Sequence, residues 1–142
     1  MAITSNASTS WTGGLADGSG TTTLGSGASF DIDWKARAET GGAVTPEELI
    51  AGAHASCYSM ALSHELGQAG FASTSIRTNV SVGFQPGTGI TGSTIEVTAV
   101  VPGIDDAKFQ EIAAAAKAGC PVSKALAGIE ITLAGATLES EG

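Results

Sequence analysis

The sequence predicts one α+β domain of 142 residues, and three features of the chain indicate this fold class. Short strand patterns rich in glycine occupy residues 1–44. The longest helical pattern of the chain follows at residues 45–67. Residues 71–138 then show a hairpin, a helix, a short helix and a last strand. Strands and helices that follow one another in this order are typical of an α+β domain.

Strands are expected at three places in the first 44 residues. Residues 11–15 and 21–24 are short strand patterns, and the turn signal at residues 17–20 joins them into a hairpin. In residues 30–37, Phe30, Ile32 and Trp34 alternate with polar side chains. This alternation predicts a third strand that has these three side chains on one face and Arg37 at its end.

Residues 45–67 carry the signals of a long helix. Thr45 is suited to be the N-cap, Pro46 lies where a missing N–H costs nothing, and Glu48 completes a capping box. Gly67 or Gly70 is expected to end the helix. Spacings of three and four residues place one set of side chains on a common face: Ala53, Cys57, Met60 or Ala61, and His64.

The last part of the chain predicts a hairpin followed by two helices and a strand. Residues 75–84 and 94–101 alternate between apolar and polar side chains, as paired antiparallel strands do. Asp105 is the predicted N-cap of a helix through residue 118. Cys120 stands just before a short helix that has Pro121 at its first position, and residues 129–133 form the last strand.

The charge of the chain excludes several partners. Fourteen acidic and six basic residues give a net charge of −8, which argues against binding to nucleic-acid phosphates and to anionic membranes. No apolar run approaches the roughly 20 residues of a membrane span, and no signal peptide is visible at the N-terminus. The expected compartment is therefore the cytoplasm, where thiols are kept reduced.

The two cysteines are the main candidates for chemistry. Cys57 and Cys120 lie 63 positions apart, and their spacing matches no zinc motif, because His54 and Cys57 supply only an i, i+3 pair. A position at a helix N-terminus favours the thiolate of Cys120, whereas Cys57 lies in mid-helix and needs a cation nearby. From the residues alone, a redox pair and two unrelated buried thiols both remain open.

Several motifs resemble those of the OsmC/Ohr family of cysteine-based hydroperoxide reductases, and of its OsmC branch in particular. The two most specific segments are TPEELIAGAHASCYSMAL around Cys57 and AGCPVSKAL around Cys120. Supporting features are Trp11 and Gly13 near the start, LGQAGF before the hairpin, VPGID before the second helix, and EITL in the last strand. They occur in the correct order over almost the whole chain.

The resemblance implies a role for each of four residues in a thiol-dependent peroxidase that reduces organic hydroperoxides. Cys57 would be the peroxidatic thiolate, which is oxidised to a sulfenic acid, and Cys120 the resolving thiol, which closes a disulfide with it. Arg37 would stabilise the thiolate and polarise the peroxide, and Glu47 would orient Arg37 through a bidentate pair. No metal or organic cofactor is implied. The implied role is defence against oxidative or osmotic stress.

The resemblance also implies an architecture and partners. The expected fold has antiparallel sheets and a long central helix, in an intertwined homodimer whose active sites lie at the subunit interface. The disulfide would be recycled by a dithiol reductant; a lipoylated protein is the family-based expectation, and thioredoxin or a small dithiol is the alternative. Candidate residues for an apolar peroxide pocket are Phe30, Trp34, Ile50, Tyr58 and Met60, each of which suits a core position equally well.

Other interpretations of these residues remain. Arg37 is also compatible with a solvated strand end, and Glu47 and Glu48 with first-turn glutamates favoured by the helix dipole. His54, one turn before Cys57, is a candidate base in a Cys–His hydrolase, although no third orienting group is visible. His64 is expected to be a packed or surface residue. A non-catalytic protein that binds a small apolar ligand, or a structural stress protein, is the alternative outside the enzymes.

Overall fold

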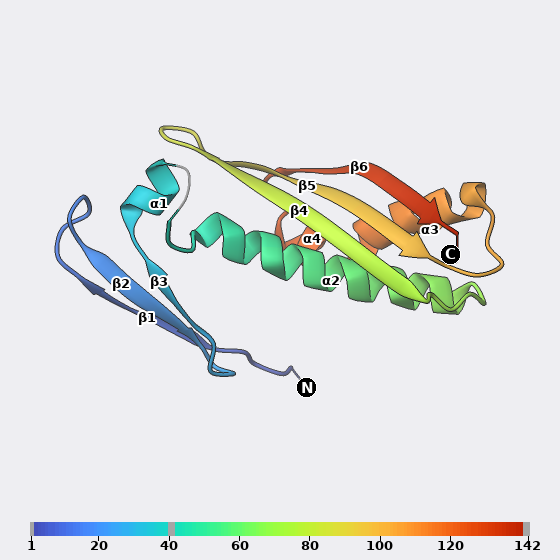
Figure 1. The fold of residues 1–142 in the computed structure, drawn as a ribbon, viewed down its shortest axis with the longest axis horizontal. Coiled ribbons are helices and arrows are strands. Elements are labelled where there is room, and N and C mark those ends of the chain that lie inside the picture. The colour runs from blue at the N-terminus through green and yellow to red at the C-terminus, as the bar shows by residue number, and fades with distance from the viewer. Residues whose placement is uncertain (1, 40–41, 141–142) are drawn as a thin grey trace. The chain divides into compact units, whose positions relative to one another are not determined.

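The computed structural model describes residues 2–39 and 42–140, and these form two three-stranded sheets and four helices (Figure 1). The α+β class predicted from the sequence is confirmed. Contacts divide the chain into two compact units, Met1–Leu49 and Ile50–Gly142.

The first unit contains an antiparallel sheet of β1 (Ala7–Thr12), β2 (Ser19–Leu24) and β3 (Ser29–Ile32), in that order. Hydroxyl pairs stabilise it across the strands: Thr9 bonds Thr22 at 2.8 Å, and Thr23 bonds Ser29 at 2.9 Å. Every residue of β1 is exposed. The sheet therefore has little core of its own.

The first predicted strand is displaced toward the N-terminus. β1 ends at Thr12, and the chain turns within residues 13–18, where Gly13 has a φ of +92° and the Asp17 carboxylate accepts from the Gly14 N–H at 3.1 Å. A Cβ on Gly18 would collide with the carbonyl oxygens of Thr12 and Gly14. Only glycine fits there, so the turn takes up residues 13–15 of the predicted strand.

The predicted strand over residues 30–37 is wrong in its second half. β3 ends at Ile32, and α1 (Trp34–Ala38) begins directly after Asp33, whose carboxylate accepts from the Ala36 N–H at 2.7 Å. Trp34 therefore does not continue the strand face of Phe30 and Ile32. Arg37 lies on a short helix, because a local N-cap followed by helix-forming residues outweighs a short alternation.

The long helix α2 (Pro46–Gln68) confirms the central prediction. The Thr45 hydroxyl accepts from the Glu48 N–H at 3.0 Å, which is the expected N-cap bond. At the other end Gly70 has a φ of +91°, and the Phe71 N–H donates to the Leu66 carbonyl at 2.9 Å. These features form a Schellman motif, so Gly70 and not Gly67 ends the helix.

The predicted face of α2 is wrong in part. The fully buried side chains follow a four-residue spacing and are His54, Tyr58, Leu62 and Leu66. Ala53, Met60 and His64 are exposed, while Cys57 and Ala61 are half-buried at the edge of the core. An Ala- and Ser-rich helix has little amphipathic contrast, so spacing alone did not select the correct face.

The second unit contains β4 (Ser75–Gln85), β5 (Gly89–Val100) and β6 (Glu130–Glu139), with β5 in the centre. The β4–β5 hairpin is antiparallel as predicted, although β5 begins earlier than expected. β6 pairs with β5 in parallel, so this sheet is mixed and not wholly antiparallel. The cause is the helical connection between them, which returns the chain in its original direction.

The core of the second unit lies between this sheet and the helices α2 and α3 (Asp106–Gly119). The α3 N-cap is Asp105, as predicted, and its carboxylate accepts from the Lys108 N–H at 2.7 Å. Burial of a large side chain such as Phe109 contributes about 1.5–3 kcal/mol. The short helix α4 (Pro121–Ala125) follows, with Cys120 as its N-cap residue. Its position brings Cys120 into the same core as α2.

Candidate active site

Cys57 and Cys120 meet in the second unit. Cys57 lies in the middle of α2 and is half-buried, whereas Cys120 is fully buried at the start of α4. Both are free thiols, and a hydrogen bond between their side chains affects the pKa of each. Residues 63 positions apart in the chain are thus brought together by the packing of α2 against the α3–α4 segment.

The surroundings of the two thiols act in opposite directions. Burial, followed by the hydrogen bond and charge of Cys120, raises the pKa of Cys57 against a lowering contribution from the Val122 backbone. Burial also tends to raise the pKa of Cys120. Hydrogen bonds from the Ser123 backbone, the Cys57 thiol, the Ser123 side chain and the Val122 backbone outweigh it, and the pKa of Cys120 is lowered. Within this pair the thiolate is therefore favoured at Cys120.

Arg37 and Glu47 form an ion pair in the first unit. One carboxylate oxygen, Oε1 of Glu47, accepts from both Nε and Nη2 of Arg37, at 2.9 and 2.8 Å. Two donors of the guanidinium thus meet the same carboxylate oxygen. The Glu47 side chain is 6% exposed and that of Arg37 is 29% exposed. A buried carboxylate consequently fixes a guanidinium that retains access to solvent.

Two helix starts position this ion pair. Asp33 caps α1 and so sets the turn that carries Arg37, and Thr45 caps α2 and sets the turn that carries Glu47. Glu47 is therefore engaged with Arg37. Glu48 contributes its backbone N–H to the Thr45 cap.

His54 does not have the environment expected of a base for Cys57. Its Nδ1 lies 2.7 Å from the Ser93 hydroxyl and its Nε2 lies 2.8 Å from the Ser123 hydroxyl, so both ring nitrogens are engaged. All three side chains are buried. Burial lowers the pKa of His54.

The two serines that hold His54 were not found from the sequence, although each left a signal. Ser93 is a polar residue in phase with Ile95 and Val97 on the buried face of β5. Ser123 lies three residues after Cys120, in the first turn of α4. A polar side chain that extends the apolar alternation of a strand, and a hydroxyl one turn after a cysteine, both point to a buried hydrogen-bond partner.

The candidate pocket residues are distributed over both units. Phe30 and Trp34 are half-buried in the first unit. In the second unit Ile50 is half-buried and Met60 is 72% exposed. Tyr58 is a core residue: it is fully buried, and its hydroxyl donates to the Ala113 carbonyl at 2.9 Å.

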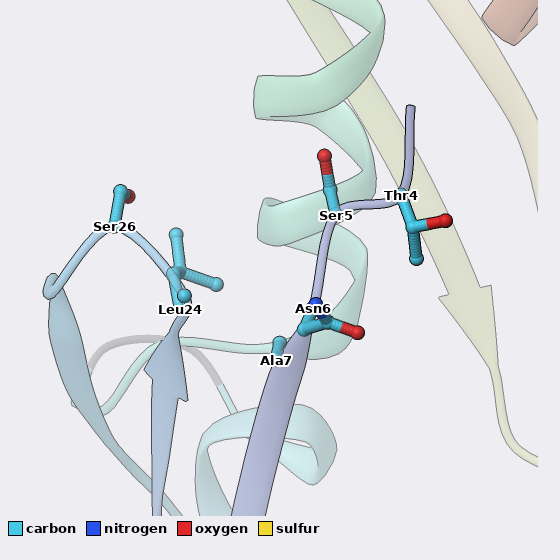
Figure 2. Close-up of a pocket in the computed structure, with 7 residues that line it drawn as sticks. Thr4, Ser5, Asn6, Ala7, Leu24 and Ser26 are labelled. Atoms are coloured by element: carbon cyan, nitrogen blue, oxygen red, sulfur yellow. The ribbon is translucent and has the colours of Figure 1, made fainter. Parts of the chain in front are cut away.

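The hollow shown in Figure 2 involves none of the predicted site residues. It has a volume of about 600 Å³ and lies beside the β1–β2 pair, lined by residues 4–7 and 24–26. Its lining side chains are small and mostly polar. They include no cysteine and no charged group, so this hollow is not the candidate active site.

Residues 2–39 and 42–140 hold no cluster of three or more His, Cys, Asp or Glu side chains that could bind a metal ion. The same ranges contain no helix that is both long and apolar enough to cross a membrane.

Comparison with known proteins identifies the family. A family model described as OsmC-like protein matches residues 39–134, which is more than half of the chain. The chain belongs to the OsmC family. More particularly, it is 42% identical over 140 residues to the peroxiredoxin OsmC of Escherichia coli (strain K12), with 94% of this chain and 96% of that protein covered. The predicted OsmC branch is confirmed, and this likeness supports a peroxidase.

Solved structures agree with this assignment. An organic hydroperoxide resistance protein OsmC from Legionella pneumophila matches with a TM-score of 0.71 and 22% identity, over 95% of this chain and 97% of that one. The organic hydroperoxide resistance protein OhrB of Bacillus subtilis matches with a TM-score of 0.59 and 29% identity, over 96% and 98% of the two chains. The first likeness shows the shared fold.

Proposed function

We propose that this protein reduces organic hydroperoxides to alcohols with Cys57 as the peroxidatic thiol and Cys120 as the resolving thiol. The observation that carries this proposal is the meeting of two free thiols from distant parts of the chain in one core. Cys57 is the half-buried member and Cys120 the fully buried one. The more accessible sulfur is the one suited to meet a peroxide.

The reaction has two steps. The Cys57 thiolate attacks the distal oxygen of ROOH, the O–O bond breaks, and the alkoxide takes up a proton to leave as ROH, while Cys57 becomes a sulfenic acid. The Cys120 sulfur then attacks the Cys57 sulfur. The S–O bond breaks and a disulfide forms, and the released hydroxide takes up the Cys120 proton as water. An external dithiol restores both thiols.

Cys57 requires a positive charge to react, because its surroundings in the second unit raise its pKa. Arg37 is the proposed source of that charge, and Glu47 is the residue that orients it. A guanidinium stabilises a thiolate and polarises a peroxide without itself losing a proton. The short contacts between Arg37 and a buried Glu47 support this role, since they hold the guanidinium in one geometry.

The proposal includes a homodimer with its active sites at the subunit interface. Two observations support it: β1 is exposed along its whole length, and α2 exposes a face that carries Met60. A partner subunit would cover both. The proposed reductant is a dithiol such as a lipoylated protein, and the proposed compartment is the cytoplasm, where Cys57 and Cys120 remain reduced between turnovers.

The hydrolase alternative loses its main support. A Cys–His hydrolase needs a histidine that takes a proton from the cysteine, but both ring nitrogens of His54 are occupied by the Ser93 and Ser123 hydroxyls.

Free-thiol counts after treatment with cumene hydroperoxide test the proposed function. The wild-type protein is expected to lose two thiols per chain. Cys120→Ser is expected to lose its one thiol to a sulfenic acid that dimedone traps, and Cys57→Ser is expected to keep its thiol. Retention of both thiols by the wild-type protein at excess hydroperoxide would show a non-catalytic member of the family.

A further inference from the structure

A hydrogen-bonded network of buried polar side chains runs from β5 through α2 to the start of α4. Ser93 contacts Nδ1 of His54 at 2.7 Å, and Ser123 contacts Nε2 at 2.8 Å. His54 is 0% exposed, Ser93 1% and Ser123 7%. The proposed peroxidase mechanism uses none of these three groups. A polar network whose hydrogen bonds are all satisfied nevertheless fixes the side chains that it joins inside an apolar core.

The network of Ser93, His54 and Ser123 lies next to Cys120. Ser123 lies in the first turn of α4, three residues after Cys120, the N-cap residue of that helix, and its side chain lowers the pKa of the Cys120 thiol. The titratable side chains that also act on Cys120 or respond to its charge are Cys57 and Tyr58, both from α2. Ser123 thus contacts the imidazole of His54 and also acts on the Cys120 thiol.

The protonation state of His54 determines the direction in which the hydrogen bonds of this network run. Its burial favours the neutral imidazole, which has one donor and one acceptor nitrogen. When Nε2 carries the proton, it donates to the Ser123 oxygen, and the Ser123 hydroxyl is free to donate to the sulfur. The Ser93 hydroxyl then donates to Nδ1. In this arrangement the hydrogen bonds of Ser93, His54 and Ser123 are all donated in the direction of Cys120.

We propose that His54 and Ser123 are positioning residues for Cys120: the imidazole holds the Ser123 hydroxyl where it donates to the Cys120 sulfur and stabilises its thiolate. This inference rests on the proposed function, in which Cys120 must attack the Cys57 sulfenic acid. A thiolate is the attacking form in disulfide formation. The network of Ser93, His54 and Ser123 therefore favours the Cys120 thiolate for the resolving step, whereas Arg37 and Glu47 serve the peroxide step.

A pH titration of Cys120 in the Cys57→Ser background tests this inference directly. That variant contains one cysteine, and serine keeps a donor at position 57. Thiolate formation is followed by ultraviolet absorbance. The single tyrosine, Tyr58, does not interfere, because burial and the charge of Cys120 raise its pKa well above the range of the thiol.

Removal of the Ser123 hydroxyl should make Cys120 harder to ionise. In Ser123→Ala the thiolate fraction at a pH below the midpoint is expected to fall about tenfold, since a hydrogen bond to a charged group has roughly that effect. Ser123→Thr, which keeps the hydroxyl, is expected to restore most of the wild-type titration. His54→Gln is expected to shift it in the same direction as Ser123→Ala.

Ser59→Ala is the matched control. The Ser59 hydroxyl on α2 hydrogen bonds to the Ala55 carbonyl and the Thr78 hydroxyl, which lie outside the network. This variant should leave the Cys120 titration unchanged. Identical titrations for Ser123→Ala, His54→Gln and Ser59→Ala in folded proteins would overturn the inference. The titration contains no hydroperoxide and no Cys57, so its result is independent of whether the protein is a peroxidase.

Discussion

The surroundings of Cys57 in the second unit disfavour its thiolate. Its helix provides no favourable dipole at mid-length, and burial together with Cys120 raises its pKa. Arg37 is one of two arginines in the chain, and its contacts with Glu47 fix its orientation. Reactivity at Cys57 should therefore follow the presence and geometry of the Arg37 guanidinium.

Arg37→Ala is expected to slow the oxidation of Cys57 by cumene hydroperoxide about 100-fold, which is the cost of losing one preorganised donor at a reacting centre. Arg37→Lys keeps the charge but not the planar fork, and should be intermediate. The rate of thiol loss is measured by stopped flow. The variant should remain folded, because leaving the buried Glu47 carboxylate unpaired costs about 3–5 kcal/mol against a typical stability of 5–15 kcal/mol.

Arg77→Ala is the matched control for this prediction. Arg77 pairs with Glu139 at 3.3 Å, and its side chain is 71% exposed. Equal oxidation rates in Arg37→Ala and Arg77→Ala would remove Arg37 from the active site.

The buried state of His54 predicts a pH dependence of stability. Burial lowers its pKa below the ordinary value of 6.5, at which the imidazole of the unfolded chain titrates. Below pH 6.5 the unfolded chain takes up a proton that native His54 does not. The stability contributed by His54 is therefore fully present above pH 6.5 and is lost as the pH falls toward the folded pKa.

Denaturant unfolding at several pH values across 6.5 measures this dependence. The free energy of unfolding of His54→Gln should decline less steeply on acidification than that of the wild-type protein. His64→Gln, at an exposed position on the same helix, controls for the loss of an imidazole. Parallel curves for His54→Gln and the wild-type protein would contradict the prediction.

At the scale of elements, the short helix α1 is the part that positions Arg37. Asp33→Ala removes its N-cap and is expected to destabilise the protein by about 1 kcal/mol. It should also slow Cys57 oxidation, because the turn that carries Arg37 is loosened. Asp31→Ala, an exposed neighbour on β3, is the control for removing a carboxylate. A normal oxidation rate in a measurably destabilised Asp33→Ala would separate α1 from catalysis.

The elements that were predicted correctly carry their signals locally. Thr45 and Asp105 cap α2 and α3 as their sequences indicate, and the alternation in residues 75–84 is that of β4. The elements predicted wrongly depend on competing local bonds. The Asp33 cap ends a strand that alternation would have continued, and the turn that includes Gly18 ends β1 at Thr12.

The candidate site was only partly visible for a related reason. The motifs that resemble the OsmC/Ohr family named the cysteines, Arg37 and Glu47. Ser93 and Ser123 lie 39 and 69 positions from His54, and only the fold brings them to its ring. The buried face of α2 was also hidden, since its small residues differ little in polarity and the packing partners decide which side is covered.

For the whole molecule, the exposed face of α2 is the proposed centre of a homodimer. Met60→Asp places a charge on that face and is expected to convert the dimer to a monomer in light scattering. Because the active sites are proposed at the interface, peroxidase activity should fall when the dimer is converted to a monomer. Asn79→Asp adds the same charge on the exposed side of β4 and should leave the mass unchanged. A wild-type protein that is already monomeric would contradict this architecture.

The central claim is that one hydroperoxide converts Cys57 and Cys120 of the same chain into a disulfide. Peptide mapping under non-reducing conditions, after addition of one equivalent of cumene hydroperoxide per chain, tests it most directly. The predicted result is a cross-linked peptide pair that contains both cysteines and separates on reduction. Recovery of both peptides with unmodified thiols, or of a disulfide that joins two Cys57 residues, would contradict the account.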